Sequence, residues 1–455
     1  MCVSVGASPR DPHVGALMTV VGAITRYGRA RRPLAESGAA AAVARPRLLL
    51  LLQSLPFPPD GGVHIRTFHV IRLLARMFDI TALCFYRRAE RPLPADVEAS
   101  LDGLRPFARV EAFPIPQEHD AARFMWDHIR SVATGNAYTW YAYDSDAVRR
   151  RVKALVAQEE FDLVHIDSLD LACYLPLLRG IPTVCAHQNV ESASLRRRAK
   201  NDRSAIRGAY LAHQANLLGR LERRWSAGMA LNITFSPDDQ RELERLAPGA
   251  AIVQLPSGVD VEPFHAAHID ERGMVSVGGI NWFSNRDALA YFTADILPRL
   301  RAMVPSASMS WIGRAEDDQR TDYRARYGVE LTGYVPDLRP VVKDAACFVV
   351  PARVGGGASL KVLDAWAMGK AIVSTSIGCE GVDAVDGENI LIRDTPDGFA
   401  MAVADVLRNP SLRDRLGSAG RATVERRYRW EVIGTGMLAA YAALLPEAFR
   451  TAAAS

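Results

Sequence analysis

The sequence predicts an α/β protein with two doubly wound domains, each built on an open parallel β-sheet. Three observations support this fold class. The chain has 455 residues, which is about three times the length of a typical single domain. From Arg47 onward, short apolar runs alternate with longer helical periods, a pattern typical of parallel strands joined by crossover helices. The pattern restarts after a turn at residues 256–260, so we expect a second sheet.

The composition is that of a folded enzyme. Hydrophobic residues make up 49% of the chain and charged residues 23%, which argues against global disorder. The formal net charge of +4, without a basic arm, does not predict a nucleic-acid partner. The six cysteines are scattered and contain no CxxC pair, so they predict buried free thiols and no metal site. We therefore expect a reducing, cytoplasmic compartment.

The N-terminal segment is not expected to belong to a folded domain. Residues 14–25 are apolar, but no basic region precedes them and they are too few to span a bilayer. The segment that follows, to Ala44, is rich in alanine and arginine. We expect residues 1–45 to form a mobile leader and the folded part to begin near Pro46.

The first domain is expected over residues 46–264. A helix is predicted at about 65–76, after the first strand. The strands of this domain are expected at 48–54, 80–86, 162–168, 182–188, 231–236 and 251–258.

The second domain is expected over residues 265–430, with residues 431–455 forming a last helix and a tail. Its strands are predicted at 274–279, 308–313, 329–333, 347–351 and 371–375. Ligands of open parallel sheets bind outside the carboxyl ends of the strands, so the loops that follow these runs are where a site is expected.

The most informative loop lies in residues 351–370 (PARVGGGASLKVLDAWAMGK), where a strand end leads through glycines into a helix. Gly355, Gly356 and Gly357 have no Cβ, so their backbone N–H groups could approach an anion closely. Ser359 is a candidate N-cap that leaves the helix dipole directed at this loop.

Charged side chains flank the glycine loop. Arg353 and Lys361 could neutralise a diphosphate without a metal ion. Asp364 lies three residues after Lys361, on nearly the same helical face, and could accept two hydrogen bonds from ribose hydroxyls. The alternative is a glycine-rich turn that permits close packing, with an exposed Lys/Asp pair.

This stretch resembles the donor site of the retaining GT-B transferases called glycosyl transferases group 1, or family 4. Residues 363–366 (LDAW) correspond to the second half of the family's paired-Glu motif, and residues 368–373 (MGKAIV) continue it. Asp364 stands for the second Glu, and Gly356 takes the place of the first. The resemblance extends over nearly all of residues 47–433 and is closest to a branch with a GGGxxLKxLEA pattern, the bacterial exopolysaccharide-associated sugar transferases.

The resemblance implies a GT-B fold, in which two Rossmann-like domains face a cleft and the last helix crosses back. It also implies transfer of a hexose-type sugar from a nucleotide-diphospho-sugar to a hydroxyl of a glycan or lipid-linked acceptor, with retention of configuration. No cofactor and no metal ion are expected. The donor site would include Gly355 to Gly357, Ser359, Leu360, Lys361 and Asp364.

Two features of the first domain match the same family. Gly61 and Gly62, with Arg66 nearby, resemble its first glycine loop, although an ordinary turn is the alternative. His187 ends an apolar run and corresponds to a histidine that faces the transferring sugar in the family, so we expect it to bind sugar. A lone histidine is otherwise more often structural.

The start of the second domain departs from the family pattern. Gly278 is followed by Gly279 and, six residues later, by Asn285, where the family usually has an arginine and a lysine that bind the diphosphate. Arg314, Arg353 and Lys361 are the candidates for the missing positive charge. A catalytically silent scaffold or partner protein is the rival interpretation.

Three further features carry open alternatives. The basic runs at 194–203 and 220–225 are expected to be solvated helix faces, with contact to an anionic inner-membrane surface as the alternative. Residues 144–146 (DSD) predict a helix N-terminus rather than a metal site.

A second rival activity is that of a nucleotide-sugar epimerase. Such an enzyme would need additional carboxylates, and no convincing set is found beyond Glu191. The pathway that the resemblance implies is cell-surface or extracellular polysaccharide synthesis.

Overall fold

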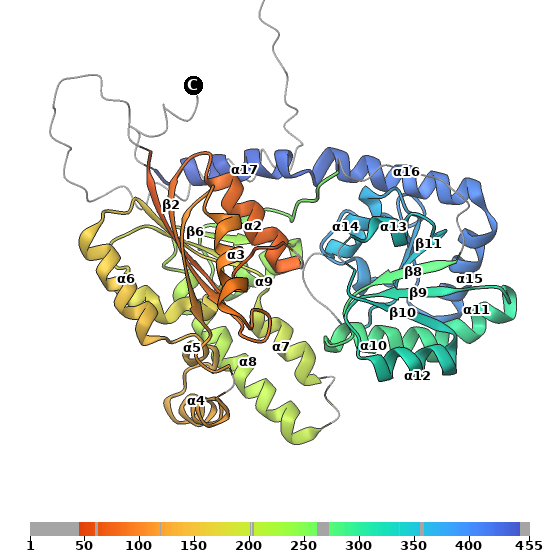
Figure 1. Cartoon of the computed structure of the whole chain (residues 1–455), viewed down its shortest axis with the longest axis horizontal. Helices are drawn as coiled ribbons and strands as arrows, with labels where there is room; N and C mark the ends of the chain where they lie inside the picture. The colour runs from red at the N-terminus through yellow and green to blue at the C-terminus, as the bar shows by residue number, and fades with distance from the viewer. Residues whose placement is uncertain are drawn as a thin grey trace, which may run out of the picture. The chain divides into compact units, whose positions relative to one another are not determined.

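The computed structural model describes residues 45–59, 62–118, 120–200, 202, 204–261, 273–335, 337–354 and 359–445. Contacts within the chain divide it into two compact units (Figure 1). Unit 1 contains the chain up to Leu255 and again from Gly434, and unit 2 spans Pro256–Ile433. The expected leader at 1–45 lies, apart from its last residue, outside the described residues.

Unit 1 contains a seven-stranded parallel sheet with the strand order β3-β2-β1-β4-β5-β6-β7. Its strands are β1 (Arg47–Leu52), β2 (Asp79–Tyr86), β3 (Arg109–Pro114), β4 (Leu163–Ile166), β5 (Thr183–His187), β6 (Leu231–Thr234) and β7 (Ile252–Gln254). The six predicted strands of the first domain are confirmed, and β3 is the one that sequence analysis missed.

The helices of unit 1 join these strands and flank the sheet. They are α2 (Gly62–Leu74), α3 (Pro94–Leu104), α4 (Ala121–Thr134), α5 (Thr139–Ala142), α6 (Asp146–Gln158), the 3₁₀ helix η1 (Leu169–Leu177), α7 (Glu191–Lys200), α8 (Ala205–Ser226) and α9 (Pro237–Leu246). Ser145 is the N-cap residue of α6, so the predicted helix start at 144–146 is confirmed.

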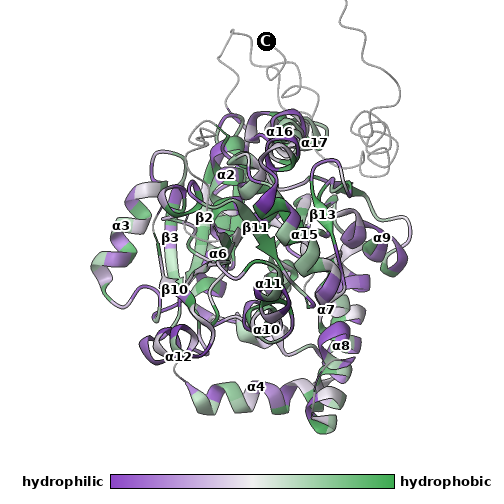
Figure 2. Ribbon diagram, turned by 90° about the vertical axis from the view of Figure 1, so that its right-hand side faces the viewer, coloured by the Kyte–Doolittle hydropathy of each residue, from purple (hydrophilic) through white to green (hydrophobic). Residues whose placement is uncertain are grey.

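The central strands of unit 1 are apolar along their whole length because both faces of a parallel sheet are covered. The leucines of β1 are almost fully buried, and Leu48 is paired in register with Ile80 of β2 and Leu163 of β4. Figure 2 shows this as hydrophobic strands surrounded by helices of mixed polarity. The last helix, α17 (Trp430–Ala442), contributes to this unit from Gly434 onward, where Tyr441 Oη lies 2.5 Å from His165 Nδ1 of β4.

Unit 2 contains a six-stranded parallel sheet with the order β10-β9-β8-β11-β12-β13. Its strands are β8 (Met274–Val277), β9 (Met309–Ile312), β10 (Val329–Gly333), β11 (Cys347–Val350), β12 (Ile372–Ser374) and β13 (Leu391–Ile392). All five predicted strands are confirmed, and the two-residue strand β13 is the addition.

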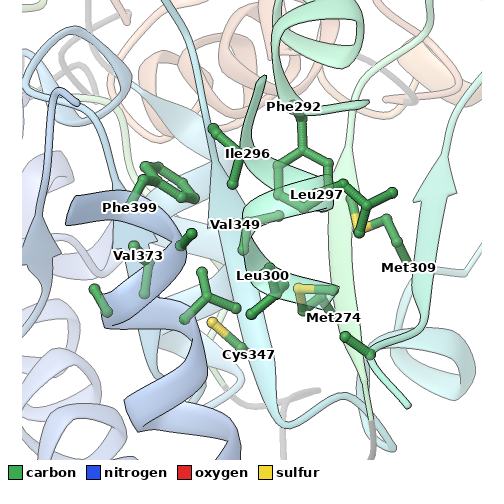
Figure 3. Packing of buried hydrophobic residues seen from close by; sticks show 14 of the residues in the cluster. Met274, Phe292, Ile296, Leu297, Leu300, Met309, Cys347, Val349, Val373 and Phe399 are labelled. Atoms are coloured by element: carbon green, nitrogen blue, oxygen red, sulfur yellow. The ribbon is translucent and has the colours of Figure 1, made fainter. Parts of the chain in front are cut away.

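The helices of unit 2 lie between and after these strands. They are α10 (Phe283–Tyr291), the π-helix η2 (Phe292–Ile296), α11 (Leu297–Met303), α12 (Asp317–Tyr327), α13 (Arg339–Val342), α14 (Leu360–Ala367), the 3₁₀ helix η3 (Ile377–Cys379), α15 (Pro396–Arg408) and α16 (Pro410–Arg427). Figure 3 shows how one face of the sheet is covered: Phe292 and Leu297, with Phe399 of α15, pack onto Val349 and Val373 of the central strands.

The described cysteines are Cys84, Cys173, Cys185, Cys347 and Cys379, and all five are buried free thiols, as predicted. Among the helices that the structure describes, none is both long enough and apolar enough to cross a bilayer. Within the same residues, no group of three or more His, Cys, Asp or Glu side chains is arranged to hold a metal ion.

Candidate donor and sugar site

The loops at the carboxyl edge of the unit 2 sheet are hydrogen-bonded to one another. Gly278 N, just after β8, donates to Ile312 O over 2.7 Å, and Ile280 N donates to Arg314 O over 3.0 Å. Gly313 N, after β9, donates to Gly333 O over 3.0 Å. The turns after β8, β9 and β10 therefore form one connected edge, where a ligand of an open parallel sheet is expected to bind.

Glycines allow the turns after β8 and β9 to approach each other closely. Gly278 and Gly313 both have a φ of 151°, a conformation that residues with a Cβ rarely adopt. A Cβ on Gly313 would lie 2.5 Å from the carbonyl carbon of Gly278, and a Cβ on Gly278 would lie 2.6 Å from Cγ of Asn285. The missing side chains leave room for the backbone of both turns and for the Asn285 amide.

Asn285 links the turn after β8 to the first turn of α14. Its Nδ2 donates to Gly279 O over 3.0 Å, and its Oδ1 accepts a hydrogen bond from Lys361 Nζ over 3.0 Å. Because the amide donates on one side and accepts on the other, its orientation is fixed. The ammonium group of Lys361 is thus held against Asn285, the position at which the family usually has a lysine.

Burial changes the pKa values of the two charged side chains on α14. Lys361 and Asp364 are both partly buried. Desolvation lowers the pKa of Lys361 to about 8. Desolvation, with a smaller contribution from repulsion by Asp260, raises the pKa of Asp364 to about 7. Both groups are therefore close to titration at neutral pH, as is common for side chains that bind a charged ligand.

Ser359 occupies the predicted N-cap position of α14, but its side chain caps no backbone N–H of the helix. Its own backbone N–H donates instead to Glu380 O over 3.2 Å. The predicted N-cap position is therefore confirmed, but the Ser359 side chain does not cap the helix. Leu360 is the first residue of α14 and packs against the apolar core.

The two arginine candidates differ in their surroundings. Arg353 forms an ion pair with Asp287 over 2.8 Å, and its guanidinium carbon lies 4.4 Å from the centre of the Tyr291 ring. The bond to Asp287 raises the pKa of Arg353. Arg314 is exposed, and its guanidinium carbon lies 5.4 Å from the centre of the Tyr334 ring. Arg314 thus remains available to an anion, whereas Asp287 already compensates much of the charge of Arg353.

Several predicted site residues lie outside the described residues, namely Gly61, Gly355, Gly356 and Gly357. Gly62 is described and begins α2. Arg66, on the same helix, is buried, with its guanidinium carbon 4.0 Å from the centre of the Phe235 ring and a hydrogen bond to Gln188 Oε1. Burial lowers the pKa of Arg66 to about 10. This arginine is held within unit 1 rather than presented to solvent.

His187 ends β5 of unit 1 and is buried. Its Nε2 lies 2.9 Å from Asn232 Oδ1, while Nδ2 of Asn232 donates to Ser226 O and Ala251 O. Because the amide nitrogen is the donor in both of those bonds, Oδ1 must accept, and Nε2 of His187 must carry a proton. Burial lowers the pKa of His187, so the ring is neutral and its Nδ1 is left as a hydrogen-bond acceptor.

A small polar pocket lies beside His187 within unit 1. Its lining includes Asp170, Glu191 and Glu222. Burial raises the pKa of Asp170 to about 6 and the pKa values of Glu191 and Glu222 to about 7. The sequence offers no convincing carboxylate set beyond Glu191, and the structure adds Asp170 and Glu222 to the lining of the same pocket. Neither was expected from the sequence, because these two residues lie on η1 and α8, which are far from Glu191 along the chain.

Residues 271–409 match the family model of glycosyl transferases group 1. A phosphatidyl-myo-inositol mannosyltransferase from Mycobacterium tuberculosis is 26% identical over 317 residues, which cover 65% of this chain and 77% of that protein. This relative is named for a lipid acceptor, so the expected membership of an exopolysaccharide-associated branch is not confirmed.

Two solved structures share the fold. Sucrose-phosphate synthase from Thermosynechococcus elongatus aligns with a TM-score of 0.64 at 15% identity, covering 90% of this chain and all (100%) of that one. HepE from Anabaena, in complex with UDP-glucose, aligns with a TM-score of 0.59 at 12% identity, covering 86% and 98%. At these identities the likeness establishes the two-sheet GT-B fold and nothing finer.

Proposed function

We propose that this chain, which has the GT-B fold, is a nucleotide-sugar glycosyltransferase of group 1 that moves a hexose from a nucleotide-diphospho-sugar to a hydroxyl of a lipid-linked or glycan acceptor. The configuration at the anomeric carbon is retained. The observation that carries this proposal is the Lys361 ammonium group, held by Asn285 at the carboxyl edge of the unit 2 sheet.

The donor diphosphate binds between Lys361 and Arg314 in this proposal. Lys361 lies in the first turn of α14, where the positive end of the helix dipole adds to its charge. Arg314 follows β9 on the same edge and is exposed. Asp364, one helical turn after Lys361, accepts hydrogen bonds from the ribose hydroxyls, and Arg353 has a smaller role because Asp287 is bound to it.

The chemistry follows from these positions. The bond between the anomeric carbon and the diphosphate oxygen breaks, and negative charge develops on the leaving diphosphate. Fixed cations already in place stabilise that charge without reorganisation, so no metal ion is required. The acceptor hydroxyl attacks the anomeric carbon from the face that the diphosphate leaves, and its proton passes to a diphosphate oxygen.

Unit 1 supplies the sugar-binding side chains. The neutral His187 offers Nδ1 as an acceptor to a sugar hydroxyl, which suits binding better than general-base catalysis because the pKa of this buried ring is lowered. The carboxyl groups of Asp170, Glu191 and Glu222 line the adjacent pocket and suit the recognition of several hydroxyls. Gly61 and Gly62, the expected first glycine loop, remain further candidates in this proposal.

A lipid acceptor is favoured over a soluble glycan. The relative from Mycobacterium tuberculosis is named for transfer to phosphatidyl-myo-inositol, and it covers 65% of this chain. A lipid-linked acceptor also fits a cytoplasmic enzyme that works at the surface of the inner membrane. The product then enters cell-surface glycan synthesis.

The test is calorimetric titration of UDP, GDP, dTDP and ADP into the full chain in the presence of a chelator. UDP is the first candidate, since HepE holds UDP-glucose, and GDP is the second. We expect micromolar binding of one nucleotide, weakened in Asp364→Ala. Asp287→Ala, which alters the ion pair of Arg353 but leaves Asp364 in place, serves as the matched carboxylate control.

The rival function is that of a silent partner in a glycan assembly complex. Two observations favour it: Asn285 replaces a lysine of the family pattern, and Asp287 compensates the charge of Arg353. If none of the four nucleotides binds, this rival replaces the transferase proposal. If a nucleotide binds and the sugar of its donor is epimerised rather than transferred, the carboxyl pocket beside His187 becomes the catalytic centre.

A further inference from the structure

Helix α4 of unit 1 is amphipathic in the reverse sense to an ordinary surface helix. The residues that it buries are polar, Asp127 and Ser131. Ser131 Oγ accepts a hydrogen bond from Gln214 Nε2 of α8 over 2.8 Å, and Asp127 accepts one from Gln117 Nε2. The helix is thus attached to the protein through its polar face.

The opposite face of α4 is apolar and exposed. The exposed fractions are 60% for Met125, 58% for Trp126, 52% for Ile129 and 58% for Val132. At 100° per residue these four side chains occupy an arc of about 120°, the width of the apolar stripe that a helix normally turns toward a core. A soluble protein rarely leaves so continuous a stripe in water unless a partner covers it.

This face lies beside the tip of the hairpin formed by α7 and α8. His128 Nδ1 of α4 is hydrogen-bonded to the hydroxyl of Tyr210, near the start of α8. Figures 1 and 2 both show α4 next to the same end of α8. Ile206, in the first turn of α8 and one helical turn before Tyr210, is an apolar side chain that is 87% exposed.

The surroundings of the apolar face are basic. The end of α7 carries Arg197, Arg198 and Lys200, all exposed. It lies next to the start of α8, since a Cβ on Gly208 would be 3.1 Å from Ala199 O. On the helix itself, Arg123 and Arg130 border the apolar arc on the side of Trp126. We call the four apolar residues of α4, together with Ile206, the apolar face, and Arg197, Arg198 and Lys200 the basic tip.

We propose that the apolar face of α4 inserts into the interface of an anionic phospholipid bilayer, with the basic tip on the lipid headgroups. A basic protein partner would not be attracted by this charge, and an apolar face with Trp, Met, Ile and Val beside arginines is the pattern of an interfacial membrane helix. The inference rests on the proposed function only in that the proposed lipid acceptor lies in the same membrane surface to which the apolar face binds. Membrane contact was the alternative for the basic run at 194–203. The proposal limits that contact to the basic tip, which forms one surface with α4.

The first test is co-sedimentation of the full chain with vesicles of phosphatidylcholine alone or with one third phosphatidylglycerol. We expect binding that requires the anionic lipid. The affinity of the variant Met125→Ser/Ile129→Ser/Val132→Ser for the anionic vesicles should be lower by about tenfold or more, because the variant removes apolar area from the inserted face. Met401→Ser, on an exposed helix position of unit 2, is the control for an exposed apolar side chain. These positions are exposed, so the fold is expected to be retained.

The second test reverses charge at two ends of one helix hairpin. Arg197→Glu/Arg198→Glu/Lys200→Glu should weaken vesicle binding about 100-fold, because each positive charge removed from the headgroup region lowers the affinity about fivefold. Arg220→Glu/Arg223→Glu/Arg224→Glu changes the same number of charges. These three arginines begin 14 residues after Ile206 on α8, about 21 Å along its axis and beyond the ~8 Å screening length. We expect this second variant to bind as the wild type does.

Insertion itself is read from the fluorescence of Trp126. Vesicles with brominated acyl chains should quench part of the tryptophan emission, and Trp126→Phe, which keeps the face apolar, should bind equally well and lose that quenching. Binding to neutral and anionic vesicles alike, equal losses in the two charge variants, or unchanged quenching in Trp126→Phe would each overturn the proposal. So would a homodimer in sedimentation velocity that the triple serine variant dissociates, because a second copy would then cover the face.

The outcome is separable from that of the proposed function. Nucleotide affinity is measured by calorimetry in each of these variants without lipid, and we expect it to be unchanged, since none of the substituted residues lies in unit 2 apart from the control. Binding of vesicles without binding of a nucleotide would support the membrane surface and contradict the transferase function. Binding of a nucleotide without binding of vesicles would support the transferase function and contradict the membrane surface.

Discussion

Lys361 Nζ donates a hydrogen bond to Asn285 Oδ1 over 3.0 Å, although the two residues are 76 positions apart. Asn285 also donates to Gly279 O, so the ammonium group of α14 is fixed against the turn after β8. The family pattern usually has a lysine at position 285 and an arginine at position 279. We therefore infer an exchange of positions, in which Lys361 supplies from α14 a charge that is absent from α10.

This exchange predicts that a lysine at position 285 restores part of the nucleotide affinity that is lost when Lys361 is replaced. Lys361→Met should weaken nucleotide-diphosphate binding about 100-fold, the worth of one or two charge-assisted hydrogen bonds. Lys361→Met/Asn285→Lys places an ammonium group on the other side of the same contact and should recover about tenfold of that loss. Calorimetry measures both. Equal affinities for the single and the double variant would contradict the exchange.

The pKa values of the proposed donor site predict a narrow pH range for binding. The pKa of Lys361 is lowered to about 8, so above that pH the free protein must take up a proton to bind a diphosphate, and affinity falls. The pKa of Asp364 is raised to about 7, so below that pH the carboxyl group is protonated and accepts ribose hydroxyls less well. Affinity should therefore be highest between about pH 7 and 8.

Arginine keeps its charge over this range, so Lys361→Arg should remove the decline on the alkaline side and leave the acidic side unchanged. Asp364→Asn should do the reverse. The measurement is the nucleotide dissociation constant from pH 6 to 9 at constant ionic strength. A decline above pH 8 that persists in Lys361→Arg would mean that another group titrates.

The fold was predictable from the sequence because buried parallel strands are continuous apolar runs. Strand β3 was missed because its residues are at most partly buried at the edge of the sheet and include Arg109 and Glu111. Strand β13 was missed because it has only two residues. In both cases the strand has too little apolar burial to leave a pattern.

The site was predictable only in part. The topology of a parallel sheet places strand ends together, so Arg314, Arg353 and Lys361 could be named from the sequence. Their partners could not, because Asn285 and Asp287 lie on α10 and only the folded structure shows which cation each one meets. The same holds for the carboxyl groups beside His187, which three separate segments bring together.

The ion pair between Arg353 and Asp287 predicts unequal roles for the two arginines. Arg314→Ala should weaken nucleotide binding about tenfold, because it removes an exposed cation from the diphosphate. Arg353→Ala should change it by less than about threefold, because the carboxylate of Asp287 compensates this guanidinium group. Calorimetric affinities of the two alanine variants test the order. A larger loss in Arg353→Ala would show that the ion pair opens on binding.

The close approach of the turns after β8 and β9 predicts a steric limit. A Cβ at position 313 would lie 2.5 Å from backbone atoms of Gly278 and Gly279, which are not free to move. Gly313→Ala should therefore lower the free energy of unfolding of unit 2 by about 2 kcal/mol or more. Gly387 also has a positive φ, of 76°, but a Cβ there would meet nothing within 4 Å, so Gly387→Ala should cost only about 1 kcal/mol. Urea unfolding compares them, and equal losses would leave only backbone strain as the cause.

The hydrogen bond between His187 and Asn232 predicts a sugar-binding role that is separate from nucleotide binding. Because His187 belongs to unit 1 and the proposed nucleotide site to unit 2, His187→Phe should leave the affinity for the nucleoside diphosphate unchanged. Transfer should fall about 100-fold in kcat/KM, as expected when a hydrogen bond formed in the transition state is removed. The measurement is initial-rate kinetics with the donor that calorimetry identifies.

Asn232→Leu provides the matching test of how the imidazole is held. It leaves the protonated Nε2 of His187 buried without its acceptor, which should cost about 1–3 kcal/mol in unfolding free energy and lower kcat/KM through a misplaced ring. Asn232→Asp keeps an acceptor and, by adding a negative charge, should raise the pKa of His187 toward its ordinary value. At saturating donor, where weaker donor binding on the acidic side no longer limits the rate, kcat would then decline below about pH 6.5 in that variant and not in the wild type, because only a neutral ring offers Nδ1 as an acceptor. A wild-type kcat that already declines there at saturating donor would show that His187 titrates in the native protein.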